Sequence, residues 1–256
     1  MRIYDNKHLN LLREITLSRF KLKDQSTIFG FMWSFLNPLL MLVVLFVFFS
    51  LANGGKVEHY VVYLLIGIIQ YTHFSNSTFD SMRILSNMKQ LTSETVFPKE
   101  LLVFGSILAN AREFILSLLI GLLVAYVSGV NFSWTVFMLP FVFVLQLMLV
   151  VWVSLLLSCV YLYVKDIDHI YQVFLRVLFF TTPIFYDLSY LGDGIAKDIA
   201  LINPLTHLIT FSRTIIIEGR PFPLNSMFML FLINSFLIYI AYKIFKKLEP
   251  TFAERI

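Results

Sequence analysis

The sequence predicts an all-α membrane protein whose single domain, residues 1–256, contains six transmembrane helices. Of its 256 residues, 58% are hydrophobic and only 14% are charged, and the mean hydropathy is +0.79. Soluble domains carry about 25% charged residues, so this chain has too few to cover a surface that faces water. A helix needs about 20 apolar residues to cross a bilayer. Six segments approach that length: about 31–52, 60–81, 101–127, 134–163, 167–185 and 225–242.

The apolar runs are continuous rather than alternating, which indicates helices and not the strands of a membrane barrel. The second run becomes polar near its end, and the fifth contains Arg176. The first run is too long for the apolar part of a cleavable signal peptide, so none is expected.

The N-terminal segment, residues 4–24, is expected to form an amphipathic interface helix ahead of the first span. Apolar side chains of residues 4–22 share about half of a helical wheel, and Lys7, Arg13 and Lys21 lie in the other half. A basic amphipathic helix on the anionic cytoplasmic surface of the membrane fits this pattern best. A helix packed on another protein at that surface is the alternative.

The first span follows an abrupt change of composition. Residues 19–24 contain three cations and one aspartate, and no charged residue follows between Gln25 and Gly55. Trp33 stands where the chain is expected to enter the bilayer, as interfacial aromatic residues do. Pro38 lacks an N–H group, so the helix is expected to bend or to begin anew there.

The distribution of Lys and Arg predicts the orientation, because these residues favour cytoplasmic loops. Fourteen of the 20 fall in the N-terminal segment, the loop after the second span, the turn after the fourth and the C-terminal tail. The alternate loops hold four, including Arg213, and two lie within spans. Both termini are therefore predicted to be cytoplasmic, in agreement with an even number of spans.

Two connecting segments are too apolar for ordinary loops. The connection between the second and third spans ends in Phe97-Pro98-Lys99-Glu100 and suits a short cytoplasmic helix that ends near Pro98. This helix is either a plain surface element or a docking knob for a cytoplasmic protein. The segment 186–224 is expected to form re-entrant or interfacial helices on the outer side, which can cap or gate a pathway.

Patterns that bind nucleotides or metals are missing from the sequence. The nearest approach to a P-loop, Ser50 to Val57, lacks the first Gly and the final Ser or Thr. The five histidines have no zinc-binding spacing, and Cys159 stands alone within a span as a packing residue. The chain is therefore expected to bind no cofactor, no metal and no nucleic acid, and to have no catalytic residues.

Three charged residues fall deep within the predicted spans. Arg112, Glu113 and Arg176 are expected to face protein or a water-filled cavity, because unpaired charges in a membrane are costly. They either lock helix packing or meet an anionic group such as a lipid diphosphate. Aromatic residues make up 16% of the chain and can stack on sugar rings. Trp33, Tyr71 and Phe74 join the three charged residues as candidates for the substrate path.

Several short motifs resemble those of the ABC type 2 polysaccharide exporter permeases, the membrane halves of bacterial O-antigen and teichoic acid exporters. Each motif alone is weak, but the set keeps the family's order over residues 19–215. The motifs are RFKLKDQS at 19–26, Gly30 with Trp33, LNPLL at 36–40, FPKEL at 97–101, YVKDI at 163–167, TPI at 182–184 and NPL at 203–205.

This resemblance implies a homodimer of six-span subunits in the bacterial inner membrane, above two separate ATPase subunits that bind ATP and Mg²⁺. It implies a coupling helix between the second and third spans and gate helices before the sixth. Phe97, Pro98, Lys99, Glu100, Arg19, Phe20 and Asp24 match the coupling regions to the ATPase. The implied cargo is a glycan on an undecaprenyl diphosphate carrier within membrane lipid.

Three other functions remain open on the sequence. An exporter of the same family with a drug or a lipid as cargo is the nearest. An intramembrane enzyme acting on polyprenyl lipids would need clustered catalytic groups, which the sequence does not supply. An ion-coupled transporter working alone would be expected to show inverted repeats.

Overall fold

A computed structural model describes residues 10, 12–17, 32–53, 59–94 and 97–255 of the chain. Within these residues all regular structure is helical, which confirms the predicted all-α class. The long helices are α2 (Trp33–Asn53), α3 (Tyr60–Asn87), α5 (Glu100–Val127), α6 (Leu139–Tyr163), α7 (Ile167–Thr181) and α10 (Leu224–Leu248). Each overlaps one of the six predicted ranges.

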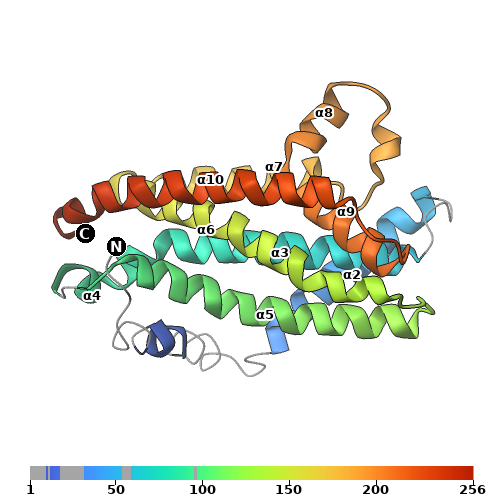
Figure 1. Cartoon of the computed structure of the whole chain (residues 1–256), viewed down its shortest axis with the longest axis horizontal. Coiled ribbons are helices and arrows are strands. Elements are labelled where there is room, and N and C mark those ends of the chain that lie inside the picture. The colour runs from blue at the N-terminus through green and yellow to red at the C-terminus, as the bar shows by residue number, and fades with distance from the viewer. Residues whose placement is uncertain (1–9, 11, 18–31, 54–58, 95–96, 256) are drawn as a thin grey trace.

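Shorter helices complete the two ends of the fold. They are α4 (Lys89–Glu94), η2 (Trp134–Met138), η3 (Leu188–Leu191), α8 (Ile195–Ile202), α9 (Pro204–Ile216), η4 (Glu249–Thr251) and α11 (Phe252–Arg255). The C-terminus and α4 lie at one end of the elongated bundle, whereas α9 lies toward the other end and α8 projects from the side (Figure 1).

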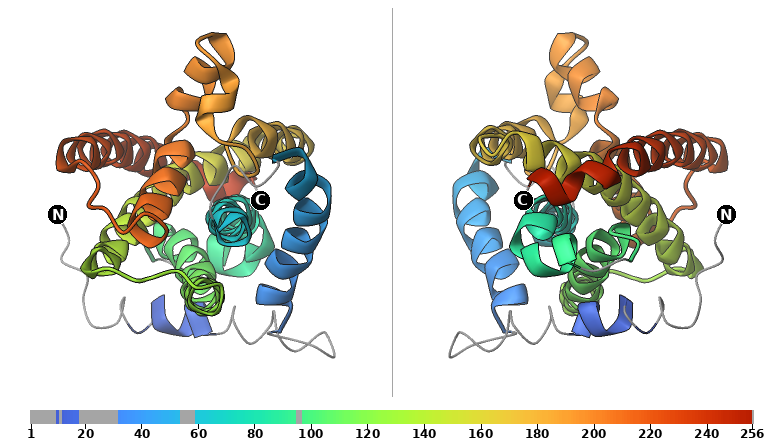
Figure 2. Two further views of the ribbon diagram at one scale, coloured as in Figure 1. Left: turned by 90° about the vertical axis from the view of Figure 1, so that its right-hand side faces the viewer. Right: turned by 90° about the vertical axis from the view of Figure 1, so that its left-hand side faces the viewer.

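Helix α3 occupies the middle of the bundle, where it contacts α2, α5, α6, α7 and α9 (Figure 2). Its first half is apolar and almost wholly buried, and polar residues dominate from Gln70 to Ser81. Neighbouring helices bury five of these polar side chains, those of Gln70, His73, Ser77, Thr78 and Ser81, so the polar composition is compatible with a place inside a membrane bundle.

By length and composition, three described helices can cross a bilayer: α5, η2 with α6 (Trp134–Tyr163), and α10 with its C-terminal extension (Leu224–Arg255). A fourth is added if α8 and α9, bent by 82° at Asn203, count as one broken span. Helix α7 has 15 residues, or about 22 Å, and α3 is too polar to qualify. The number of six spans therefore stays a prediction.

Helix α2 runs through Pro38 without a break, so the helix does not begin anew at that residue as the sequence allowed. Trp33 lies in its first turn with 37% of its surface exposed. Residues Leu36–Phe49 form the apolar stretch of this helix. Its inner side packs on α3 and α5.

The predicted interface helix is described only in part, and residues 12–17 are helical. Ile15 is 5% exposed and packs against α5 at Gly105. A Cβ atom on Gly105 would lie 2.6 Å from Ile15 Cγ2, so the glycine allows this close approach. Ile15 therefore faces α5 of the same chain, whereas Leu17 is 38% exposed. The choice between the membrane surface and another protein as the support of this segment stays a prediction.

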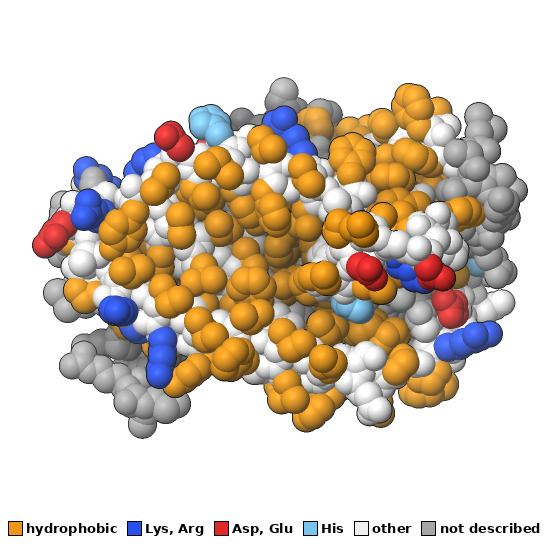
Figure 3. Space-filling view, turned by 90° about the horizontal axis from the view of Figure 1, so that it is seen from above, with side chains coloured by type: hydrophobic (Ala, Val, Ile, Leu, Met, Phe, Trp, Pro, Cys, Tyr) orange, Lys and Arg blue, Asp and Glu red, His pale blue; other side chains and the backbone are white. Residues whose placement is uncertain are grey.

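Apolar side chains cover much of the middle of the face seen in Figure 3, and most charged groups lie toward its ends. The exposed residues of α10 on the surface include Phe228, Leu232 and Phe236, which are 62%, 51% and 63% exposed. Such a band is expected where lipid replaces water as the surrounding medium.

Arg213 differs from the sequence expectation. The sequence places it among the cations of the outer loops, whereas in the structure it lies in α9 with only 6% of its surface exposed. The reason is that α9 packs against α3, and the guanidinium lies against Tyr63 and the carbonyls of Pro183 and Ile184. The position of a cation between two spans does not reveal this burial.

Candidate functional site

The connection between α4 and α5 carries the predicted coupling motif at the end of the bundle that holds the C-terminus. Helix α4 has only six residues. The Thr92 side chain is fully buried and donates from Oγ1 to the carbonyls of Leu85 and Met88, 2.9 Å from each. These bonds fold α4 back on the end of α3. Helix α4 also contacts α11, so two segments distant in sequence form one surface.

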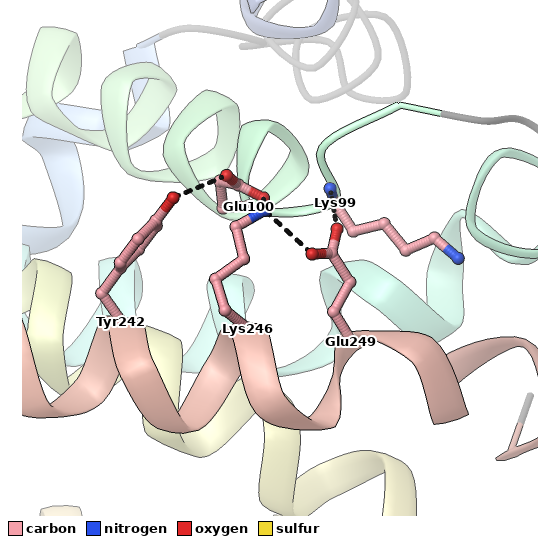
Figure 4. Close-up of polar contacts among 5 residues, drawn as sticks. All are labelled: Lys99, Glu100, Tyr242, Lys246 and Glu249. Carbon is pink, nitrogen blue, oxygen red and sulfur yellow. Dashed lines mark hydrogen bonds and ion pairs between the residues drawn. The ribbon is translucent and has the colours of Figure 1, made fainter. Parts of the chain in front are cut away.

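Glu100, the last residue of the predicted coupling motif, is buried and paired (Figure 4). Its carboxylate lies 2.7 Å from Lys246 Nζ on α10, and Tyr242 donates a 3.4 Å hydrogen bond to its other oxygen. Lys246 also lies 2.8 Å from the Glu249 carboxylate. The lysine thus stands between two acidic groups from different helices.

A backbone contact closes the same network. The Lys99 N–H donates to Glu249 Oε1 at 2.9 Å (Figure 4). The Glu249 carboxylate therefore accepts hydrogen bonds from Lys99, just before α5, and from Lys246 of α10. We define Lys99, Glu100, Tyr242, Lys246 and Glu249 as the α5–α10 junction. Because a buried charge needs its partners, the start of α5 is expected to move together with the end of α10.

The other two residues of the coupling motif are half-buried rather than freely exposed. Phe97 packs against the hydrophobic core, and Pro98 precedes α5. Arg19, Phe20 and Asp24, the remaining predicted coupling residues, lie outside the described residues. The structure therefore brings the motif onto α10, a contact that the sequence did not predict.

Lys246 and Glu249 were missed because the C-terminal tail reads as a solvated basic segment. Their spacing of three residues places them on one helix face and is a weak signal for a local ion pair. Nothing in the sequence indicates that the same lysine pairs with Glu100, which is 146 positions away.

A second polar link joins α3 to the first turn of α7 and to the turn that precedes it. Arg83 donates from Nε to Asp168 Oδ1 at 2.6 Å and forms an ion pair with the other carboxylate oxygen. Lys165 Nζ donates to Ser86 Oγ at 2.9 Å. Partial burial lowers the pKa of Lys165, and the nearby charge of Lys89 lowers it further. This end of the bundle thus concentrates positive charge.

An internal cavity lies between α2, α3 and α5. It is lined by Pro38, Ile69, Thr72, His73, Asn76, Asn110, Glu113, Phe114 and Ser117. His73 is 5% exposed, stacks on Phe114 with ring centroids 4.3 Å apart, and has no hydrogen-bond partner at either ring nitrogen. Because a neutral imidazole offers one donor and one acceptor, a water molecule in the cavity is the expected partner.

The predicted substrate-path residues do not converge on this cavity. Glu113 lines it, whereas its neighbour Arg112 is exposed on the surface of α5. Arg176 is exposed on α7, which lies across the bundle from α5 (Figure 2).

The predicted aromatic candidates also lie apart. Tyr71 donates to the Leu175 carbonyl and stacks edge-on against Phe179, which joins α3 to α7. Phe74 is a buried core residue, and Trp33 lies at the start of α2.

Among the described residues, no group of three or more His, Cys, Asp or Glu side chains could hold a metal ion. The polar features instead join helices across the bundle. At the C-terminal end, one polar link joins α5 to α10 and the other joins α3 to α7.

The chain is similar to known proteins over most of its length. Residues 12–217 match the family model described as "ABC-2 type transporter". The chain is 26% identical over 251 residues to the O-antigen export system permease protein RfbA of Myxococcus xanthus, covering 98% of this chain and 96% of the relative. It is 25% identical over 249 residues to the protein of that name from Klebsiella pneumoniae, covering 96% and 94%. Since the family model covers most of its length, this chain belongs to the ABC-2 type transporter family, as a multi-pass membrane subunit of a transporter rather than an enzyme.

Proposed function

We propose that this chain is the permease subunit of an ATP-driven exporter that moves a lipid-linked polysaccharide across the bacterial inner membrane. The observation that carries the proposal is similarity over nearly the whole chain to permeases named for O-antigen export. The sequence lacks a P-loop, so the proposal assigns ATP and Mg²⁺ to two separate ATPase subunits. The cargo is a glycan on an undecaprenyl diphosphate carrier.

The proposal includes six spans per subunit, with both termini in the cytoplasm. Helix α3 has 28 residues, or about 42 Å, and its central position offsets its polar composition. Helix α7 is short, but the chain after it stays in contact with α3, where Tyr60 and Tyr63 donate to the carbonyls of Phe185 and Tyr186. The excess of Lys and Arg at the end that holds α4 and α11 supports a cytoplasmic place for that end.

We infer a homodimer, because six helices hardly enclose a passage wide enough for a sugar chain. Exposed apolar side chains on α2 and α7, such as Val47 and Phe174, offer surface for a second copy or for lipid. The substrate path would then use residues from both subunits. Arg176 and Trp33, exposed on one subunit, are candidates for that path together with Arg112, Glu113, Tyr71 and Phe74.

The proposed mechanism uses the α5–α10 junction. Closure of the ATPase pair on ATP displaces α4 and the Phe97–Glu100 connection, together with the interface helix that holds Arg19, Phe20 and Asp24. The Glu100–Lys246 ion pair supports the transmission of this displacement to α10 as well as to α5. ATP binding thereby biases the bundle between closed and conducting forms.

Reconstitution in proteoliposomes tests the proposal. The chain with its ATPase is expected to export lipid-linked glycan with ATP, and glycan is expected to stimulate ATP hydrolysis. The chain without the ATPase is expected to transport nothing. Stimulation by drugs or free lipids but not by glycan would assign a different cargo. Full transport by the chain alone would contradict the separate motor.

A further inference from the structure

The segment that follows α7 is held by an unusual row of hydrogen bonds. Four consecutive backbone carbonyls, from Pro183 to Tyr186, each accept from a side chain of another element. Arg213 Nη1 donates to the Pro183 carbonyl and Nη2 to the Ile184 carbonyl, both at 2.7 Å. The hydroxyls of Tyr60 and Tyr63 donate to the carbonyls of Phe185 and Tyr186, both at 2.9 Å. We call residues 183–186 the clamped segment.

Arg213 also ties this segment to α3. Its Nε and Nη2 donate to the Tyr63 carbonyl at 3.1 and 3.0 Å, and its guanidinium carbon lies 3.3 Å from the centroid of the Tyr63 ring. The guanidinium is therefore satisfied by carbonyls of two separate segments and by an aromatic face. An arginine stays charged in proteins, so its burial depends on these contacts.

Helix α3 provides the space that the guanidinium needs. A Cβ atom on Gly67 would lie 2.8 Å from Arg213 Nη2 and 3.2 Å from the Ile184 Cα. A side chain at this position would push both the arginine and the clamped segment away. The glycine, the two tyrosines and the arginine thus act on the same four-residue segment from two helices.

The clamped segment stands at the base of the projecting part of the fold. Asn203 Nδ2 donates to Thr182 Oγ1 at 2.8 Å, which joins the chain just before this projection to the chain just after it. The projection between them contains η3 and α8 (Figure 1). Ile195 and Ile202 of α8 are 79% and 81% exposed, so little of its own packing holds the projection in place.

We propose that Arg213 is a positioning residue, the latch that keeps the connection from α7 to α9 closed on α3 until export begins. This inference rests on the proposed function. Separating the clamped segment from α3 would strip a buried cation of its partners, so intermediate positions are disfavoured. The segment is expected to have two discrete states, one latched and one in which the guanidinium reaches water.

Hydrogen exchange measured by mass spectrometry tests the latch on the complex of permease and ATPase in nanodiscs without ATP. Arg213→Gln and the double variant Tyr60→Phe/Tyr63→Phe are expected to exchange amides of residues 183–202 at least about fivefold faster than wild type, with α5 and α10 unchanged. The tyrosine variant removes only the two hydroxyl donors and keeps the rings and Arg213. It therefore tests the latch even if Arg213→Gln fails to fold. Arg213→Lys keeps the charge but not the forked donors of the guanidinium, so its exchange rate is expected to lie between those of wild type and Arg213→Gln.

Arg220→Gln is the matched control, because Arg220 lies exposed just after α9. It is expected to behave as wild type.

Leakage of calcein from proteoliposomes without ATP supplies the second readout. The latch variants are expected to leak and the control is not. If amides of residues 183–202 exchange at the wild-type rate in the latch variants, the proposed latch is wrong. If they exchange faster but calcein does not leak, the latch does not close a path across the membrane. If wild type exports no glycan, the proposed function fails, whereas the exchange and leakage data still decide the latch.

Discussion

Gly105 shows how one missing side chain determines where the N-terminal helical segment lies. Ile15 Cγ2 would stand 2.6 Å from a Cβ at this position, and Ile15 Cβ would stand 3.3 Å away. Both atoms lie close to the backbone of residues 12–17, so they cannot move aside without moving the segment. Contact between this segment and α5 therefore depends on a glycine that no sequence motif marks.

We expect Gly105→Ala to displace residues 12–17 from α5 and to lower the free energy of unfolding by about 1–3 kcal/mol. Thermal unfolding of the purified protein in detergent measures the loss. Gly194→Ala is the matched control, since a Cβ there has nothing within 4 Å and the φ of −177° suits any residue. Equal stability of the two variants would contradict the close contact.

At the scale of elements, the α5–α10 junction joins helices that are separated by most of the chain. Glu100 has a side chain only 2% exposed and Lys246 one that is 34% exposed, so solvent screens this pair incompletely. Breaking such a pair leaves a buried carboxylate without its cation, which is costlier than losing an exposed ion pair.

A double-mutant cycle measures how strongly the junction couples the two helices. Glu100→Gln and Lys246→Met are each expected to lower the free energy of unfolding by about 1–3 kcal/mol. The double variant should lose less than the sum, with a coupling energy of about 1 kcal/mol or more. Glu254→Gln, on the exposed side of α11, should change stability by less than about 0.5 kcal/mol. Additive losses would show that the pair does not couple the helices.

For the whole molecule, the two ends of the bundle differ in charge and in the elements that they carry. The proposed cytoplasmic end holds α4, α11 and most of the Lys and Arg residues that the structure describes, whereas α8 projects from the side nearer the other end (Figure 1). Because Lys and Arg favour the cytoplasmic side, this difference supports an orientation with α4 and α11 in the cytoplasm and α8 outside.

Cysteine labelling of intact spheroplasts checks the orientation. Asp198→Cys on α8 is expected to react with a membrane-impermeant maleimide from outside, and Lys247→Cys on α10 only after permeabilisation. Both positions are exposed in the fold. The single native cysteine, Cys159, is 2% exposed and provides an unreactive background. The opposite labelling pattern would invert the proposed topology.

The pattern of apolar and turn residues along the chain predicted the helical class, the positions of the six long helices and the FPKEL connection. These properties depend on local composition, since apolar length and turn residues act on neighbouring positions. The sequence also lacks a P-loop, since the nearest approach to this local motif misses two of its positions. Helix ends were predicted less well: α3 continues to Asn87 and α7 stops at Thr181.

Only the tertiary structure decided which polar residues meet. Arg213 and Tyr63 lie 150 positions apart, as do Lys99 and Glu249, and no local pattern marks either pair. Arg213 is buried because α9 packs on α3. Lys246 pairs with Glu100 because the end of α10 lies against the start of α5. The physical reason is that burial belongs to the assembled bundle, whereas hydrophobic periodicity describes one helix at a time.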